Sequence, residues 1–113
     1  MQKPVVRKDL LTANMDGSRP IAKVDIQEVT MEEGVKAPLH SHPCPTMGIV
    51  TEGTIAFEIE GNQTQTLRVG DAFYEPANVR IAKFNNVGNS PAKFVVFYLL
   101  GENENETIRV LKK

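Results

Sequence analysis

Short runs in which apolar and polar residues alternate dominate the chain, and helical periodicity is nearly absent. The clearest run is TIAFEIE at residues 54–60, where Ile55, Phe57 and Ile59 share one face and polar or small side chains occupy the other. Successive side chains of a β-strand point to opposite faces, so this pattern predicts a strand with one buried side.

A second alternating run, residues 21–30, places Ala22, Val24 and Ile26 on a common face. Glycine-containing turns separate such runs along the chain; we expect hairpins at Gly53 and Gly61, because glycine tolerates positive φ. Many short strands divided by frequent turn signals are typical of a β-sandwich or β-barrel. The predicted fold class is therefore all-β.

One run departs from the alternation. Residues 92–100, AKFVVFYLL, are apolar on both faces, which predicts a strand that is covered on both sides. In a small barrel the second cover would come from another subunit, and we therefore predict a homodimer. A strand buried between two layers of the same chain explains the pattern equally well.

Length and composition narrow the possible functions. The chain has 113 residues, which suits one domain spanning residues 1–113. Its 13 basic and 14 acidic residues leave a net charge of -1, so we expect no nucleic-acid partner. No apolar run approaches the roughly 20 residues that cross a bilayer, and no membrane partner is expected. The start lacks the apolar stretch of a secretory signal, and Cys44 is the single cysteine, so the cytoplasm is the expected compartment.

The only cluster of candidate ligands is HSHPCP at residues 40–45. Because residues two apart in a strand point to the same side, His40 and His42 are expected to project together into the space that this face encloses. Imidazoles bind Zn, Fe, Ni, Cu or Mn, although two alone make a weak site. The alternative is that both histidines are hydrogen-bonded in a polar pocket.

The spacing of certain glycine, histidine, proline and asparagine residues resembles two sequence motifs of the cupin superfamily, in particular of its small, single-domain, RmlC-like members. The first motif, at about residues 34–53, and the second, at about residues 70–85, are carried by Gly34, His40, His42, Gly53, Gly70, Pro76, Asn78 and Asn85. The resemblance implies a double-stranded β-helix, also called a jelly-roll barrel, with a small-molecule pocket inside. Asn78 stands where the motif has glycine, a mild change because asparagine also adopts the left-handed conformation.

The resemblance also implies four metal ligands, and only two of them are present. Thr46 stands where the first motif has glutamate or glutamine, and Ile81 stands where the second motif has histidine. Isoleucine cannot ligate a metal, and a threonine hydroxyl is a weak neutral ligand. The sequence thus predicts a degenerate metal site that holds Zn, Ni, Fe or Mn weakly or not at all.

Two nearby residues are candidates to fill the gap. Cys44 would be a strong ligand as a thiolate, but Pro43 and Pro45 bracket it and predict a turn rather than an inward position. Glu75 is expected to face solvent, unless the strand that carries it is offset. Neither is assigned as a ligand, although Cys44 remains an alternative.

The sequence predicts only in part which side chains face the pocket. One aromatic is expected from Phe73 or Tyr74 and another from Phe94 or Phe97, and a shift of one residue in register exchanges the members of each pair. Lys83 would share a face with Ile81 in a regular strand, and we expect it to extend to solvent at the rim.

Our main hypothesis is a small-molecule-binding cupin of unassigned substrate, whose pocket contains His40, His42, Thr46 and Ile81. Catalysis without metal is compatible with this pocket, because an imidazole can act as acid or base near neutral pH. The alternative is a metal-dependent enzyme of the oxygenase or isomerase type, in which His40 and His42 are completed by Cys44, water or the substrate.

Overall fold

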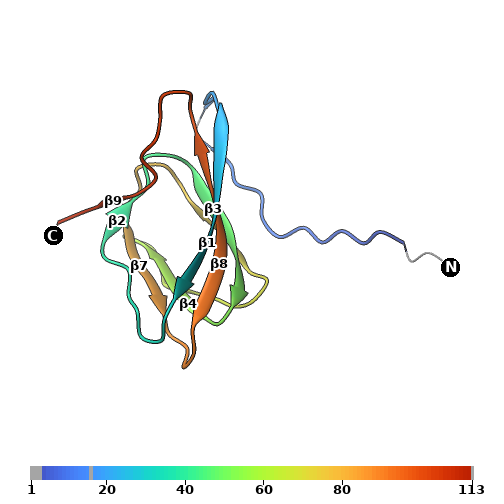
Figure 1. The fold of residues 1–113 in the computed structure, drawn as a ribbon, viewed down its shortest axis with the longest axis vertical. Helices are drawn as coiled ribbons and strands as arrows, with labels where there is room; N and C mark the ends of the chain where they lie inside the picture. The colour runs from blue at the N-terminus through green and yellow to red at the C-terminus, as the bar shows by residue number, and fades with distance from the viewer. Residues whose placement is uncertain (1–3, 16, 113) are drawn as a thin grey trace.

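A computed structural model describes residues 4–15 and 17–112. It contains nine β-strands and no helix among the described residues, so no helix there is long enough to cross a membrane (Figure 1). The strands are β1 (Lys23–Met31), β2 (His40–Ser41), β3 (Thr46–Glu52), β4 (Ile55–Ile59), β5 (Gln65–Leu67), β6 (Ala72–Glu75), β7 (Ile81–Asn86), β8 (Ala92–Leu100) and β9 (Arg109–Val110).

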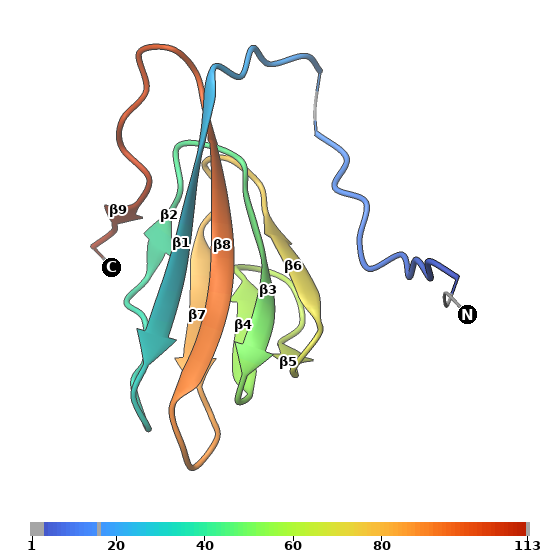
Figure 2. The same ribbon diagram turned by 45° about the vertical axis from the view of Figure 1, so that its right-hand side comes forward.

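The strands form two antiparallel sheets that face each other. One sheet has the order β1-β8-β3-β6 and the other has the order β5-β4-β7-β2-β9 (Figure 2). Neighbours within each sheet are mostly distant in sequence, because the chain crosses from one sheet to the other at several turns. This is the jelly-roll arrangement that the sequence predicts.

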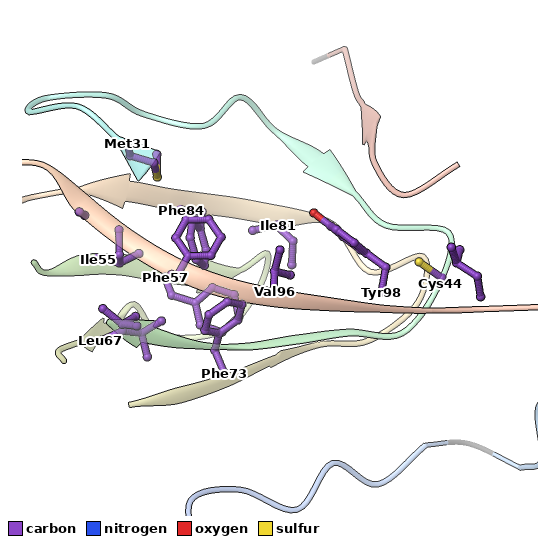
Figure 3. Packing of buried hydrophobic residues seen from close by; sticks show 14 residues of the cluster. Met31, Cys44, Ile55, Phe57, Leu67, Phe73, Ile81, Phe84, Val96 and Tyr98 are labelled. Atoms are coloured by element: carbon purple, nitrogen blue, oxygen red, sulfur yellow. The ribbon is translucent and has the colours of Figure 1, made fainter. Parts of the chain in front are cut away.

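Aromatic side chains fill the space between the sheets. Phe73 from β6 and Phe94 from β8 contact Phe84 from β7, with ring centroids 5.1 and 4.9 Å apart respectively, in edge-to-face arrangements. Phe57 from β4 joins the same cluster (Figure 3). The register question is thereby answered: Phe73 and Phe94 point inward, whereas Tyr74 and Phe97 lie on the outer face.

The turn chemistry agrees with the sequence at most positions. Asn78 adopts φ of 65°, which is the left-handed conformation expected where the cupin motif has glycine. Gly61 has a φ of 91° and connects the paired strands β4 and β5, as a hairpin turn should. Gly53 also has positive φ, but its turn joins β3 to β4, which belong to different sheets, so the predicted hairpin there is wrong.

The first strand forms where the sequence predicts it, but its apolar face points away from the core. Val24 and Ile26 are exposed, because their partners in β8 are the outward-facing Leu99 and Phe97. The face opposite the buried residues of β8 carries polar Asp25 and Gln27 first, and only its later positions, Val29 and Met31, are shielded from solvent.

Strand β8 is covered fully on one side only. Its residues alternate between buried and half-buried along the whole of Ala92–Leu100. Within the described residues the strand is therefore not enclosed by two layers of the same chain. Its outer face belongs to the same surface as the exposed side of β1.

Gly48 is a position where the fold requires the absence of a side chain. A Cβ atom there would overlap the backbone oxygen of Val95 and would lie 2.6 Å from Cζ of Phe73. We expect Gly48→Ala to lower the free energy of unfolding by about 1–3 kcal/mol, the usual effect of overpacking a core. Urea unfolding of the purified variant measures this change.

Gly88→Ala is the matched control, since its Cβ would meet no atom closer than 3.5 Å. Equal stability of the Gly48 and Gly88 variants would contradict the close packing of β3 against β6 and β8.

Candidate metal centre

Strand β2, which lies between β7 and β9, carries His40, and His42 directly follows it. His40 pairs with Ile81 of β7 on one side and with Val110 of β9 on the other. The carbonyl of His42 accepts a hydrogen bond of 2.7 Å from the backbone N–H of Asn78. Both imidazoles are about 4% exposed, and their ring centroids are 5.0 Å apart, so they point together into the barrel.

Backbone carbonyls fix the same tautomer on both rings. Nδ1 of His40 lies 2.7 Å from the carbonyl oxygen of Pro38, and Nδ1 of His42 lies 2.7 Å from that of Thr107. A carbonyl oxygen only accepts hydrogen bonds, so each Nδ1 must carry the proton and donate it. In the neutral ring each Nε2 then presents a lone pair to the interior, which is the state that a metal ligand needs.

Glu75 provides a third potential ligand between the two rings. Its Oε2 lies 3.3 Å from Nε2 of His42 and 3.7 Å from Nε2 of His40. The candidate ligand atoms of all three residues lie within 4.8 Å of one another. The expectation that Glu75 faces solvent is wrong, since the residue is only 3% exposed. It shares its inward face with Phe73, two residues earlier.

The pairing of β3 with β6 explains how a carboxylate reaches the two histidines although Thr46 occupies the glutamate position of the motif. Thr46 in β3 and Glu75 in β6 are directly opposite each other, and both point inward. The threonine side chain is short and fully buried, and its hydroxyl donates to the carbonyl of Cys44, 3.1 Å away. The carboxylate therefore enters the same space from the neighbouring strand.

Two atoms of this cluster are left without hydrogen-bond partners. Nε2 of His42 and Oε2 of Glu75 are buried, and their 3.3 Å approach lacks the alignment of a hydrogen bond. A buried polar atom without a partner is costly, and lone pairs that face a carboxylate repel it. A cation bound among the three residues removes both costs, so the donor set fits a divalent metal.

Without a metal, a proton on the His42 ring offsets the cost of burying these two atoms without partners. Burial alone would lower the pKa of His42, but the adjacent Glu75 carboxylate, which stabilises a protonated ring, outweighs burial together with the Thr107 carbonyl and raises the pKa above 6.5. Burial raises the pKa of Glu75, but the two nearby histidines, which stabilise its charged form, outweigh burial and lower the pKa below 4.5. Metal and proton therefore compete for one position.

A cavity of about 420 Å³ opens beside the cluster. His40, His42 and Glu75 line it together with mostly apolar side chains from β1, β7 and β8 and with Thr107 and Ile108 of the C-terminal segment. Tyr98 lies next to His42, with ring centroids 5.6 Å apart. Burial, followed by the charges of Glu75 and Cys44, raises the pKa of Tyr98 to about 12, so its hydroxyl remains a proton donor.

The structure separates the residues that the sequence grouped into one pocket. His40 and His42 line the cavity, whereas Thr46 and Ile81 are fully buried in the packing around it and are not among its lining residues. Cys44 is also fully buried but lies outside the histidine–glutamate cluster. Burial raises the pKa of its thiol, which disfavours the thiolate that metals bind.

Lys83 does not share the face of Ile81. The pairing of β7 with β4 shifts between Glu58 and Ile59, and this irregularity turns Lys83 outward, where its Nζ lies 3.6 Å from a carboxylate oxygen of Glu58. The prediction that this lysine reaches solvent is confirmed, since its side chain is 49% exposed.

Comparison with known proteins identifies the family. A family model described as "Cupin domain" matches residues 27–98, which is more than half of the chain and includes all three clustered residues. The chain belongs to the cupin family. No curated protein sequence matches it significantly.

Solved structures confirm the cupin fold. A cupin-like protein from Thermotoga maritima is 22% identical, with a TM-score of 0.68 over 78% of this chain and 64% of its own. An RmlC-like cupin with a double-stranded β-helix fold, from Methanocaldococcus jannaschii, is 21% identical, with a TM-score of 0.62 over 67% of this chain and 69% of its own.

An oxalate oxidase in complex with the substrate analogue glycolate is similar as well, at 26% identity and a TM-score of 0.65. The match covers 78% of this cupin but 46% of the oxidase, so the chain spans about half of that protein's length.

Sequence reasoning missed Glu75, although a signal was available. Phe73 and Glu75 are two residues apart in one strand and must share a face. Once the larger aromatic is placed in the core, the carboxylate follows it inward. The contribution of Thr107 left no such signal, because a backbone carbonyl has no signature in the sequence.

The metal-free cupin should be most stable in a mildly acidic window. Glu75 contributes stability that is present above its ordinary pKa of 4.5 and is lost as pH falls through its lowered folded value. His42 contributes stability that is complete below its ordinary 6.5 and is lost as pH rises through its raised folded value. Urea unfolding of chelator-treated protein across the acid and neutral range should therefore show a maximum between these limits.

Glu75→Gln should remove the loss of stability at both low and high pH. Glu33→Gln, at an exposed turn, is the control and should keep both losses. If the wild type and the Glu75 variant lose stability in parallel over the whole range, the ion pair does not exist.

Proposed function

We propose that this cupin binds a divalent transition metal through His40, His42 and Glu75 and holds a small organic molecule in the adjoining cavity. The observation that carries the proposal is the pair of buried, unpartnered atoms, Nε2 of His42 and Oε2 of Glu75, which face each other inside the barrel. It replaces the hypothesis of a site reduced to two ligands, because the third ligand comes from β6.

Two imidazoles and one carboxylate form a ligand set known for iron(II) sites with open positions, and zinc, nickel and manganese bind such donors too. The metal, when bound, would act as a Lewis acid toward an oxygen atom of the organic molecule. The carbonyls of Pro38 and Thr107 hold the two rings in the orientation that ligation requires.

The cavity walls indicate the kind of molecule that fits. Most of the lining is apolar, including Val29, Phe94 and Val96, so the body of the ligand should be apolar. A divalent ion with two neutral imidazoles and one carboxylate leaves one positive charge, and Lys36 lies at the exposed edge of the cavity. The residual charge of the site and the charge of Lys36 both favour a ligand with one negative charge on oxygen. The hydroxyl of Tyr98 can donate a hydrogen bond to this ligand.

Catalysis on the bound molecule is the second candidate function. Its support is the similarity to an oxalate oxidase that binds glycolate, a small oxygen-bearing substrate analogue. Under this candidate Tyr98 is the residue placed to donate a proton or a hydrogen bond to a substrate oxygen beside His42.

Assembly and location remain proposals. The half-exposed outer face of β8 supports the homodimer that the sequence predicts. The predicted cytoplasmic location and the predicted lack of a nucleic-acid partner rest on composition alone.

Protein purified without added metal should contain a transition metal at close to one equivalent. His40→Ala, His42→Ala and Glu75→Gln should each weaken metal binding by more than the roughly 10–100-fold that loss of an outer-shell partner causes, because each removes a direct ligand. Elemental analysis and competition with a chelator measure both quantities.

Two variants make the test specific to the cluster. Cys44→Ser should leave the metal content unchanged, and Thr46→Glu combined with Glu75→Thr should recover part of the metal that Glu75→Thr alone loses, since the two positions face each other. A folded Glu75→Gln protein that retains full metal affinity would refute the site.

Ligand binding should depend on both the metal and the charge of the ligand. Calorimetric titration of metal-loaded protein with 3-methylbutanoate should show binding at least about tenfold tighter than with the uncharged 3-methylbutanol, equivalent to about 1.4 kcal/mol. Equal affinity for the two compounds, or unchanged binding of the acid to Glu75→Gln, would contradict a metal-directed anion site.

A further inference from the structure

The last part of the chain returns to the histidine–glutamate cluster after β8. It first makes a turn at residues 101–104, which is closed by a hydrogen bond of 3.2 Å from the backbone N–H of Glu104 to the carbonyl of Gly101. The chain then runs back to the edge of the barrel beside β2 (Figure 2). We call residues 105–112, which include β9, the strap.

The strap is attached to the barrel mainly by polar and backbone contacts at the surface. None of its residues is buried, and its side chains Ile108 and Val110 are 47% and 63% exposed. Strand β9 is two residues long and pairs with β2, and a further backbone hydrogen bond of 2.9 Å joins the N–H of Leu111 to the carbonyl of Leu39. Segments with few buried apolar contacts and exposed hydrogen bonds open locally at low cost in free energy.

The turn before the strap is fixed more firmly than the strap itself. A carboxylate oxygen of Glu104 lies 3.1 Å from the guanidinium of Arg19, which also donates a hydrogen bond of 3.2 Å to the carbonyl of Pro43. The side-chain contact that ties the strap to β1 is an exposed hydrogen bond of 2.7 Å from Nζ of Lys23 to Oδ1 of Asn105. The strap can therefore move about the turn while the turn and the barrel keep their places.

One atom of the strap belongs to the metal site. The carbonyl oxygen of Thr107 accepts the Nδ1 proton of His42 at 2.7 Å, across 65 positions of the sequence. His40 has a corresponding acceptor in the carbonyl of Pro38, but that residue lies only two positions earlier in the same part of the chain. Release of the strap would therefore free the ring of His42 and leave the ring of His40 held.

We propose that the strap is a movable part of the metal site: metal binding holds it closed, and its opening lets the metal leave. This inference rests on the proposed metal site and adds the element that controls metal exchange. When Nε2 of His42 carries a metal, the ring loses electron density and its Nδ1 proton becomes a stronger donor to Thr107. In return, the carbonyl makes Nε2 a better ligand. Such coupling is reciprocal, so each event favours the other by the same factor.

Opening of the strap also exposes the ligands. The side chains of His40, His42 and Glu75 are at most 5% exposed while the strap is closed. Thr107 and Ile108 form part of the cavity wall, and displacement of the strap removes them from it. Water and chelating molecules then reach the histidine end of the cavity. The strap should therefore control the rate of metal release as well as the affinity.

Amide exchange of the wild-type chain tests the coupling without any substitution. The protein is compared with and without Zn²⁺ at one pH above the pKa of His42, so that the metal-free ring is neutral. The amide of Leu111 should exchange at least about tenfold more slowly with Zn²⁺, because the closed strap and the bound metal stabilise each other. The amide of Glu104, in the fixed turn, should exchange at the same rate in both samples.

A substitution in the strap tests the reverse direction. Leu111→Pro removes the N–H that binds the Leu39 carbonyl and changes no ligand. The affinity for Zn²⁺ should fall by about 10–100-fold, the usual effect of losing an outer-shell partner, and a chelator should remove Zn²⁺ faster. Glu102→Pro is the matched control, because proline is favoured at the second position of a β-turn, and it should leave both quantities unchanged.

The imidazole signals distinguish a positioning role from a general loss of stability. In NMR spectra of the Zn²⁺-loaded protein, the Nδ1 proton of His42 should be visible in the wild type and broadened or lost in Leu111→Pro. The Nδ1 proton of His40 should remain visible in both, since the Pro38 carbonyl is not part of the strap. Loss of both signals, or of neither, would contradict the proposal.

The remaining outcomes separate the strap from the metal site. Zn²⁺ bound at the three ligands without any effect on the exchange of the Leu111 amide would overturn the strap and leave the site. A strap amide that exchanges as slowly as the barrel core, with and without Zn²⁺, would make the segment a fixed wall. A wild-type protein that binds no Zn²⁺ would overturn both the site and the strap.

Discussion

A buried carboxylate facing two imidazoles is the constraint around which the functional end of this barrel is organised. Glu75 is almost completely removed from water, and burying a lone charge is costly unless a partner compensates it. Both histidines must therefore remain close to it and correctly oriented. Much of the local backbone serves this purpose.

Three separate parts of the chain maintain the orientation. Strand β2 is held between β7 and β9, which fixes the backbone of His40. The loop before β2 supplies the Pro38 carbonyl, and the C-terminal segment supplies the Thr107 carbonyl. The segment after β8 therefore has a structural role at the site. It returns to the barrel, orients one imidazole and closes one wall of the cavity.

The sequence predicted the architecture and half of the site. Alternation and turn residues indicated the strands, and His40 and His42 were identifiable because their spacing places both on one face. Glu75 was missed because an acidic residue next to a proline suggests a surface turn, and its pairing with Thr46 is what places the carboxylate beside the ligand position of the motif. The outward position of Val24 and Ile26 was also not predictable, because alternation reveals that a strand has an apolar face but not which way that face points.

X-ray absorption spectroscopy of the metal-loaded protein tests the central claim most directly. The account predicts nitrogen and oxygen ligands at about 2.0–2.2 Å, with the outer-shell scattering of two imidazoles and a change in that first shell in Glu75→Gln. A sulfur ligand at about 2.3 Å, which would implicate Cys44, or a first shell unaffected by the Glu75 substitution, would contradict it.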